Sequence, residues 1–195
     1  YNFAKLWVIY IPCGFTNHKR NNEKPEEWFK NTYPSIYHHL VDVENELSKT
    51  RSSKSKGLYK RDDQGEYWWE LRSCKYLDDF FKQKIIYPNM TKYLPFFLDN
   101  QSFFTNQKCY IITGTNLAFL TAFLNSKLFK YCFREYFPQL QGGTRELSKI
   151  FFEKIPVPLI STETNKIYEK IVLEIQKNYM NNTINNELED IIDEM

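Results

Sequence analysis

Basic side chains gather on the serine-rich stretch from Ser48 to Glu66. A mobile loop with this composition can follow a phosphate backbone, where its cations displace the counterions condensed on a nucleic acid. The cations of this stretch include Arg51, Lys54, Lys56, Lys60 and Arg61. We expect phosphate contacts from Lys54, Lys56, Lys60 and Arg61, and the alternative is a solvated surface of uneven charge.

Two further arginines are candidates for phosphate contacts, and each has a competing structural role. Arg72 could pair with Glu70 or with an aspartate, and Arg145 could pair with Glu146 or Glu153. A guanidinium suits either role, because its planar donors fit a carboxylate as well as a phosphate. We expect both arginines to contact phosphates.

Amides, hydroxyls and a lysine cluster in two short loops, PNMTK and FTNQK. Side chains of these types hydrogen-bond to base edges: Asn pairs with adenine through two bonds, and Lys donates to guanine. We expect base readout from Asn89, Thr91, Lys92 and Asn106. The alternative is that they are solvated loop residues.

Signs of catalysis are weak. The chain has no glycine-rich phosphate loop, HExxH motif or GxSxG motif. The pairs Asp62-Asp63 and Asp78-Asp79 could hold the metal of a small nuclease, but both lie among turn-forming residues. Neighbouring residues of an extended chain also point to opposite faces. We therefore assign no catalytic residue and no metal ligand.

The four cysteines are widely spaced and include no CxxC pair, which argues against a disulfide framework or a zinc ribbon. We expect reduced, mostly buried thiols, as in a cytoplasmic protein. The alternative is a metal site that draws on Cys13, His18, His38 or His39.

Charge is distributed unevenly along the chain. The net charge is +2, but residues 163–195 carry 3 Lys and 8 acidic residues, and residues 49–92 carry 11 Lys or Arg against 6 acidic residues. A basic body with an acidic tail indicates a polyanionic partner for the body. The apolar stretches are too short for a membrane-spanning helix, so no membrane partner is expected.

Three apolar, β-branched stretches predict strands: Leu6–Pro12, Lys84–Pro88 and Lys108–Gly114. The first is expected to be buried. The chain opens at Tyr1 almost directly into this pattern, which suggests a fragment of a longer protein.

Helical spacing of apolar residues follows Pro34, and a long apolar helix is expected over residues 116–137, capped by Thr115 and ended by Pro138. From about Thr164 the pattern is again helical. These elements predict an α+β fold, in which a small twisted mixed sheet is flanked by helices. We expect a recognition domain over residues 1–160 and a helical tail over residues 161–195.

Three segments of the sequence resemble a known family: GEYWWELRSCKYLDDFFKQKIIYPNMTKYLPFFLDN, FFTNQKCYIITGTNLAFLTAFLNSKLFKYCF and QGGTRELSKIFFEKIPVP. They resemble the C-terminal specificity domain of TaqI-like DNA methyltransferases, which also occurs in type IIG restriction enzymes. The resemblance covers roughly residues 1–160. Because such domains diverge where they contact bases, its recognisable elements WWELR and LNSKLF are expected to be scaffold.

The resemblance implies a target recognition domain that binds double-stranded DNA sequence-specifically and has no catalytic activity of its own. The parent is then a bacterial restriction–modification protein, a type II restriction enzyme or N6-adenine DNA methyltransferase. S-adenosylmethionine and Mg²⁺ are expected to bind its other domains, and none of these cofactors is expected to bind this fragment. The partners implied are double-stranded DNA and the methyltransferase and nuclease domains of the parent chain.

Two other classes of function stay open at this point. One is a protein-interaction module whose acidic tail docks a methylase or nuclease partner. The other is a small metal-dependent nuclease that uses the aspartate pairs.

Overall fold

The structure, a computed structural model, describes residues 4–52, 56–183 and 186–194. The chain forms two compact units. One unit is Leu6–Lys75, and the other consists of Tyr76–Met195 with the first five residues. Each unit has a hydrophobic cluster of its own.

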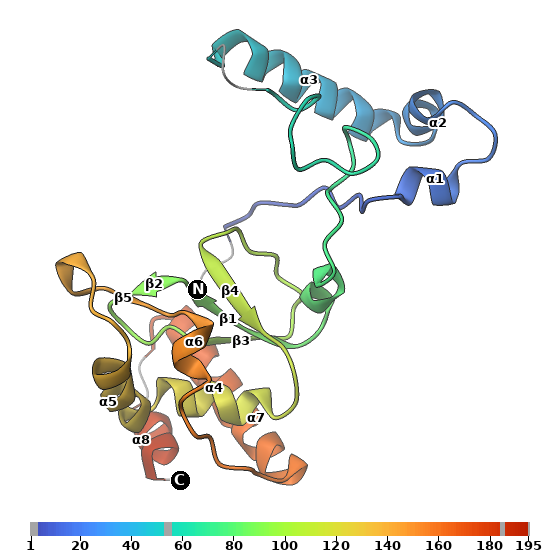
Figure 1. Cartoon of the computed structure of the whole chain (residues 1–195). Coiled ribbons are helices and arrows are strands. Elements are labelled where there is room, and N and C mark those ends of the chain that lie inside the picture. Colours follow the sequence, from blue (N-terminus) through green and yellow to red (C-terminus); the bar gives the residue numbers. More distant parts are fainter. Residues whose placement is uncertain (1–3, 53–55, 184–185, 195) are drawn as a thin grey trace. The chain divides into compact units, whose positions relative to one another are not determined.

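The unit Leu6–Lys75 is built from three helices and irregular chain: α1 (Phe15–Lys19), α2 (Pro25–Thr32) and α3 (Pro34–Thr50) (Figure 1). Proline occupies the first turn of α2 and of α3, where its missing N–H has no bond to lose. The helix expected after Pro34 is therefore confirmed.

The strand expected over Leu6–Pro12 is wrong. The described residues of this segment belong to no strand, and Leu6 and Trp7 are 77% and 87% exposed. Of the segment's apolar residues, Ile11 is buried. Its carbonyl accepts a hydrogen bond from the Leu71 N–H at 2.8 Å. A β-branched stretch becomes a strand only where another segment supplies a pairing edge.

Aromatic stacking forms the core of this unit. The Trp69 ring stacks on Phe29 at a centroid distance of 4.9 Å, and on Tyr67 at 5.0 Å. The Trp69 indole N–H donates to Thr16 Oγ1 at 2.8 Å. The WWELR segment thus supplies packing and buried hydrogen bonds, as a scaffold element does.

The unit Tyr76–Met195 contains an antiparallel sheet in the order β3-β1-β4. Its strands are β1 (Lys84–Pro88), β3 (Phe97–Asp99) and β4 (Cys109–Ile112). The strands expected at KIIYP and KCYIITG are confirmed. A second pair joins β2 (Met90–Thr91) to β5 (Arg145–Glu146). The α+β class is confirmed, and every described strand pair is antiparallel where a mixture of directions was expected.

Helices form the other layer of this unit (Figure 1). Helix α4 (Leu117–Asn125) packs on β1 and β3, and α7 (Thr162–Met180) packs on α4 and β3. Helices α5 (Lys127–Tyr136), α6 (Lys149–Phe152) and α8 (Asn186–Glu194) complete the layer, with short 3-10 turns at Leu77–Phe81 and Gln141–Gly143.

The single helix expected over residues 116–137 is two helices, α4 and α5, which meet at Ser126. Ser126 has extended backbone angles, and its hydroxyl oxygen accepts from the Phe129 N–H, so it caps α5. The cap expected from Thr115 is also wrong. The residue before α4 is Asn116, whose side-chain amide donates to the Ile160 carbonyl.

Helices α7 and α8, the expected tail, lie in the same compact unit as the sheet. The division into a recognition domain before residue 160 and a tail after it is functional, and it stays a prediction. In the described part of the chain, no helix combines the length and the apolar character needed to cross a membrane.

A buried ion pair joins β1 to β3. Lys84 and Asp99 face each other across the strands, and both side chains are 0% exposed. Lys84 also donates to the Phe80 carbonyl, and Asp99 accepts from the Gln101 and Phe103 N–H groups. These bonds satisfy both charges in a place that water does not reach.

We predict that Lys84→Met lowers the free energy of unfolding by about 3–5 kcal/mol, because it leaves the Asp99 carboxylate buried without a cation. Urea denaturation of the whole chain measures this change.

Lys82→Met is the matched control. Lys82 pairs with Asp79 at 2.7 Å on the surface, so its loss should change stability little. Equal destabilisation by the two substitutions would contradict a structural role for the buried pair.

Candidate nucleic-acid interface

The β2–β5 pair brings together two segments that sequence analysis singled out separately. Thr91, a predicted base reader, lies opposite Arg145, a predicted phosphate contact. Asn89, just before β2, donates its backbone N–H to the Lys108 carbonyl at 2.9 Å and accepts from the Leu147 N–H at 2.9 Å. Hydrogen bonds of Asn89 thus join the β2–β5 pair to Lys108, just before β4, and to Leu147, just after β5.

Arg145 is held in a fixed position. Its guanidinium lies 5.7 Å from the centroid of the Phe133 ring, and its Nη1 donates to the Phe137 carbonyl. The alternative pairing with Glu146 or Glu153 is not among the ion pairs of the described residues. An arginine fixed by one carbonyl and one ring keeps further N–H donors for a ligand.

A hollow of about 590 Å³ lies between the turn after β2 and α5. We call it the basic hollow. Its lining includes the cations Lys92, Lys130, Arg134 and Arg145 and one acidic residue, Glu135. The rest of the lining is Tyr93, Leu94, Asn125, Phe133, Gln139 and Gly143. Four cations against one carboxylate make this surface attractive to an anion.

Lys130 and Arg134 are not among the contacts predicted from the sequence. Both are exposed on α5, and together with Lys127 they are spaced three and four residues apart. Residues at these spacings share one helix face. We call Lys127, Lys130 and Arg134 the α5 stripe. The spacing is visible in the sequence, but the many apolar residues around these cations predict one long apolar helix instead.

Two of the predicted base readers also shape turns. The Thr91 hydroxyl donates to the Tyr93 carbonyl at 2.9 Å and accepts from the Tyr93 N–H at 3.0 Å. Asn106 Oδ1 accepts from the Lys108 N–H at 3.0 Å, ahead of β4. Asn106 is exposed and is not part of the lining of the basic hollow. Lys92 is exposed and lines the hollow.

The other predicted phosphate contacts lie in the unit Leu6–Lys75. Lys54 lies outside the described residues. Lys56 is exposed and pairs with Asp62, and Lys60 and Arg72 are exposed. These side chains therefore belong to a different unit from the basic hollow.

Arg61 has a structural role in that unit. Its Nη2 donates to the Glu70 carbonyl at 2.6 Å, and its side chain is 24% exposed. It also donates to the Trp68 carbonyl at 3.4 Å. Because this side chain is mostly buried and Nη2 is bonded inside the unit, Arg61 is less suited to a phosphate than Lys56 or Lys60.

The pairing considered between Arg72 and Glu70 is wrong. Glu70 is fully buried, and its carboxylate accepts from the backbone N–H groups of Gly14, Thr16 and Glu66 at 2.9–3.1 Å. Backbone donors, rather than a cation, satisfy this charge.

The aspartate pairs make local ion pairs. Asp62 pairs with Lys56, and Asp79 pairs with Lys82. Across the described residues, no group of three or more His, Cys, Asp or Glu side chains could hold a metal ion. The four cysteines are free thiols, but Cys13 is exposed and the other three are half-buried, so the prediction of mostly buried thiols is wrong. Partial burial raises the pKa of Cys109.

The basic stretch is anchored to α3 by Glu44. This carboxylate is 4% exposed and accepts from the Leu58 N–H at 2.7 Å and from Arg51 Nη1 at 2.6 Å. The Leu58 N–H, and then the Arg51 guanidinium, hold the pKa of Glu44 below its ordinary value. Arg51 is therefore occupied at the base of this segment, while Lys56 and Lys60 lie beyond it.

The chain is thus an α+β domain with a cation-lined surface that suits an anionic ligand. The chain belongs to the family of the TaqI-like C-terminal specificity domain, which matches residues 9–157. The resemblance found in the sequence is thereby confirmed.

The chain is also similar in sequence to the type II methyltransferase M.MjaIV of Methanocaldococcus jannaschii. It is 28% identical to this chain over 191 residues. The match covers 91% of this chain and 60% of the relative, so the chain spans about 60% of the length of that methyltransferase.

We predict that the Glu44 anchor is lost in acid. Because the pKa of Glu44 is lower in the folded chain, the anchor is complete above the unfolded pKa of about 4.3. It is lost as the pH falls through the folded value. Hydrogen exchange of the Leu58 amide, corrected for its intrinsic rate, should show protection down to that range and a loss below it.

Glu46→Gln is the control for this measurement. Glu46 pairs with Lys49 on the exposed face of the same helix, so Leu58 should keep its protection. A Leu58 amide whose protection does not change with pH would rule out the anchor.

Proposed function

We propose that this chain is the target recognition domain of a restriction–modification protein and binds double-stranded DNA sequence-specifically. The observation that carries the proposal is the convergence of Lys92, Lys130, Arg134 and Arg145 in the basic hollow, beside the turn after β2. Membership of a specificity-domain family supports DNA as the anion. Phosphate contacts fix orientation on a duplex, and base contacts select the sequence.

Each element has a distinct part in this proposal. Lys130, Arg134 and Arg145 bind backbone phosphates, because they surround a concave surface and keep donors for a ligand. Asn89, just before β2, and Lys92, in the turn after it, read base edges. Thr91 shapes that turn through its bonds to Tyr93.

The remaining predicted contacts are secondary in this proposal. Asn106 keeps its amide nitrogen as a donor, because its oxygen is used by the Lys108 N–H. Lys56, Lys60 and Arg72 bind phosphates from the unit Leu6–Lys75, and Lys54 is assigned the same role from its sequence alone. Arg61 is the weakest of these assignments, since it is bonded to the Glu70 carbonyl.

The parent protein is proposed to be an adenine-specific DNA methyltransferase, of the type II class that is named for the relative in Methanocaldococcus jannaschii. In this proposal the methyl transfer, and any cleavage, belong to domains outside this chain. Those domains would bind S-adenosylmethionine and Mg²⁺. Contacts made by this chain offset part of the few kcal/mol that flipping the target adenine costs.

Selection from a random double-stranded DNA library at low salt tests the proposal. An enriched short motif, recovered with the purified chain, is the expected result and identifies the target. Binding that is salt-sensitive but selects no motif would contradict sequence-specific readout by this chain. A complete lack of binding would instead favour a protein-interaction module.

We predict that Lys130→Met weakens binding to every duplex alike, because it removes a phosphate contact. The slope of log affinity against log salt should fall by about 1. Fluorescence anisotropy across a salt series measures both quantities. An unchanged slope would remove Lys130 from the interface.

We predict a different outcome for Lys92→Met, which has the same change of side chain. It should cost about 1–3 kcal/mol on the selected sequence and relax the preference at one base pair. A repeat of the selection with the variant measures the preference. Equal loss on all sequences would reassign Lys92 to the phosphates.

A further inference from the structure

The last described helix, α8 (Asn186–Glu194), is strongly acidic. It carries five acidic residues and no basic residue: Glu187, Glu189, Asp190, Asp193 and Glu194. In a domain with a cationic surface, such a helix resembles a short stretch of phosphate backbone in its charge. Where α8 docks therefore matters for DNA binding.

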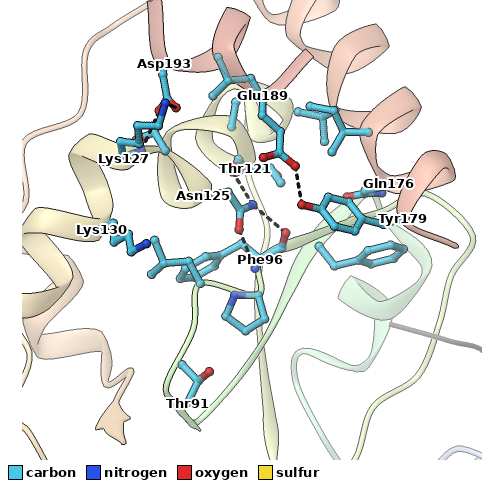
Figure 2. A pocket seen from close by; sticks show the side chains of 18 of the residues that line it. Thr91, Phe96, Thr121, Asn125, Lys127, Lys130, Gln176, Tyr179, Glu189 and Asp193 are labelled. Carbon is cyan, nitrogen blue, oxygen red and sulfur yellow. Dashed lines mark hydrogen bonds and ion pairs between the residues drawn. The ribbon is translucent and has the colours of Figure 1, made fainter. Parts of the chain in front are cut away.

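Helix α8 docks on the first residue of the α5 stripe. Asp193 Oδ1 accepts from the Lys127 backbone N–H at 2.7 Å, and its Oδ2 lies 3.1 Å from Lys127 Nζ. Asp190 Oδ1 lies 3.4 Å from the same Nζ. Figure 2 shows Asp193 beside Lys127. The carboxylates of Asp193 and Asp190 raise the pKa of Lys127. Two carboxylates thus occupy a lysine at the start of α5, where a phosphate would also be favoured.

The same helix face continues into the basic hollow. Lys130 lines both the hollow and a neighbouring cavity of about 910 Å³. Lys127, Glu189 and Asp193 also line that cavity (Figure 2). The carboxylates of α8 therefore lie at one end of the row of cations whose other members face the hollow.

Helix α8 is attached to α5 through Asp190 and through Asp193, whose side chain is 18% exposed. The Lys127 and Asp190 side chains are 75% and 60% exposed, and exposed ion pairs contribute little stability. Ile192 packs half-buried against the core, and Tyr179 bonds to Glu189. A helix this short is not stable by itself in water, so α8 depends on these few contacts.

We propose that Lys127 is a further DNA phosphate contact and that α8 covers it in the free chain as an intramolecular competitor of DNA. This inference rests on the proposed function. DNA that follows the α5 stripe from Arg134 past Lys130 reaches Lys127, and it displaces Asp190 and Asp193. Apparent affinity is then reduced by the fraction of chains in which α8 is docked.

The test compares two variants of the whole chain that lose the same charge. Asp193→Asn breaks the contact with Lys127, whereas Glu174→Gln on α7 leaves that contact intact. With a short duplex at low salt, Asp193→Asn should bind about two- to fivefold more tightly than Glu174→Gln. In a Lys127→Met background this difference should vanish, since the site that α8 covers is gone.

Hydrogen exchange gives an independent readout on the unmodified chain. Saturating duplex should speed exchange of the α8 amides and slow exchange at the start of α5. Equal affinities of the two variants, or α8 amides that are unchanged or protected by DNA, would overturn this inference alone. If the unmodified chain binds no duplex at low salt, the proposed function fails as well.

Discussion

The ion pair between Lys84 and Asp99 sets the geometry on which the larger unit depends. Two opposite charges removed from water must be satisfied by each other and by the backbone, so their surroundings have little freedom. Here the pair aligns β1 with β3, holds the turn that ends near Phe81, and orders the chain after Asp99. Only Asn89 separates β1 from β2, so the position of β1 also sets the position of the turn after β2, which lines the basic hollow.

The smaller unit also contains a buried charge, but backbone N–H groups satisfy it instead of a cation. The Glu70 carboxylate is buried among three backbone N–H groups, which join the start of α1 to the chain before Trp69. Glu44, a buried residue of α3, repeats the pattern by accepting from the Leu58 N–H and from Arg51. Because these carboxylates take donors from distant segments, they hold irregular chain in place in a unit whose described residues form no strand.

Charged side chains of the larger unit are arranged by sign. Cations from β5, from α5 and from the turn after β2 converge on one hollow, and the acidic helix α8 docks at the end of the same row. Attraction of this kind acts between charges whatever molecule carries them, so in the proposed function a tail carboxylate and a DNA phosphate would compete for the same lysine. In this proposal the same row of cations binds DNA and, in the free chain, binds α8.

Local patterns in the sequence were sufficient for several elements. The strands at Lys84–Pro88 and Cys109–Ile112, the helix from Pro34, the α+β class and the family follow from periodicity, proline positions and quoted motifs. Tertiary structure alone decided the rest. It left Leu6 exposed, engaged Arg61 with the Glu70 carbonyl, and placed Lys92 beside Lys130. The reason is physical: periodicity and turn chemistry act between neighbours in the chain, whereas strand pairing, buried charge and converging cations depend on which distant segments meet.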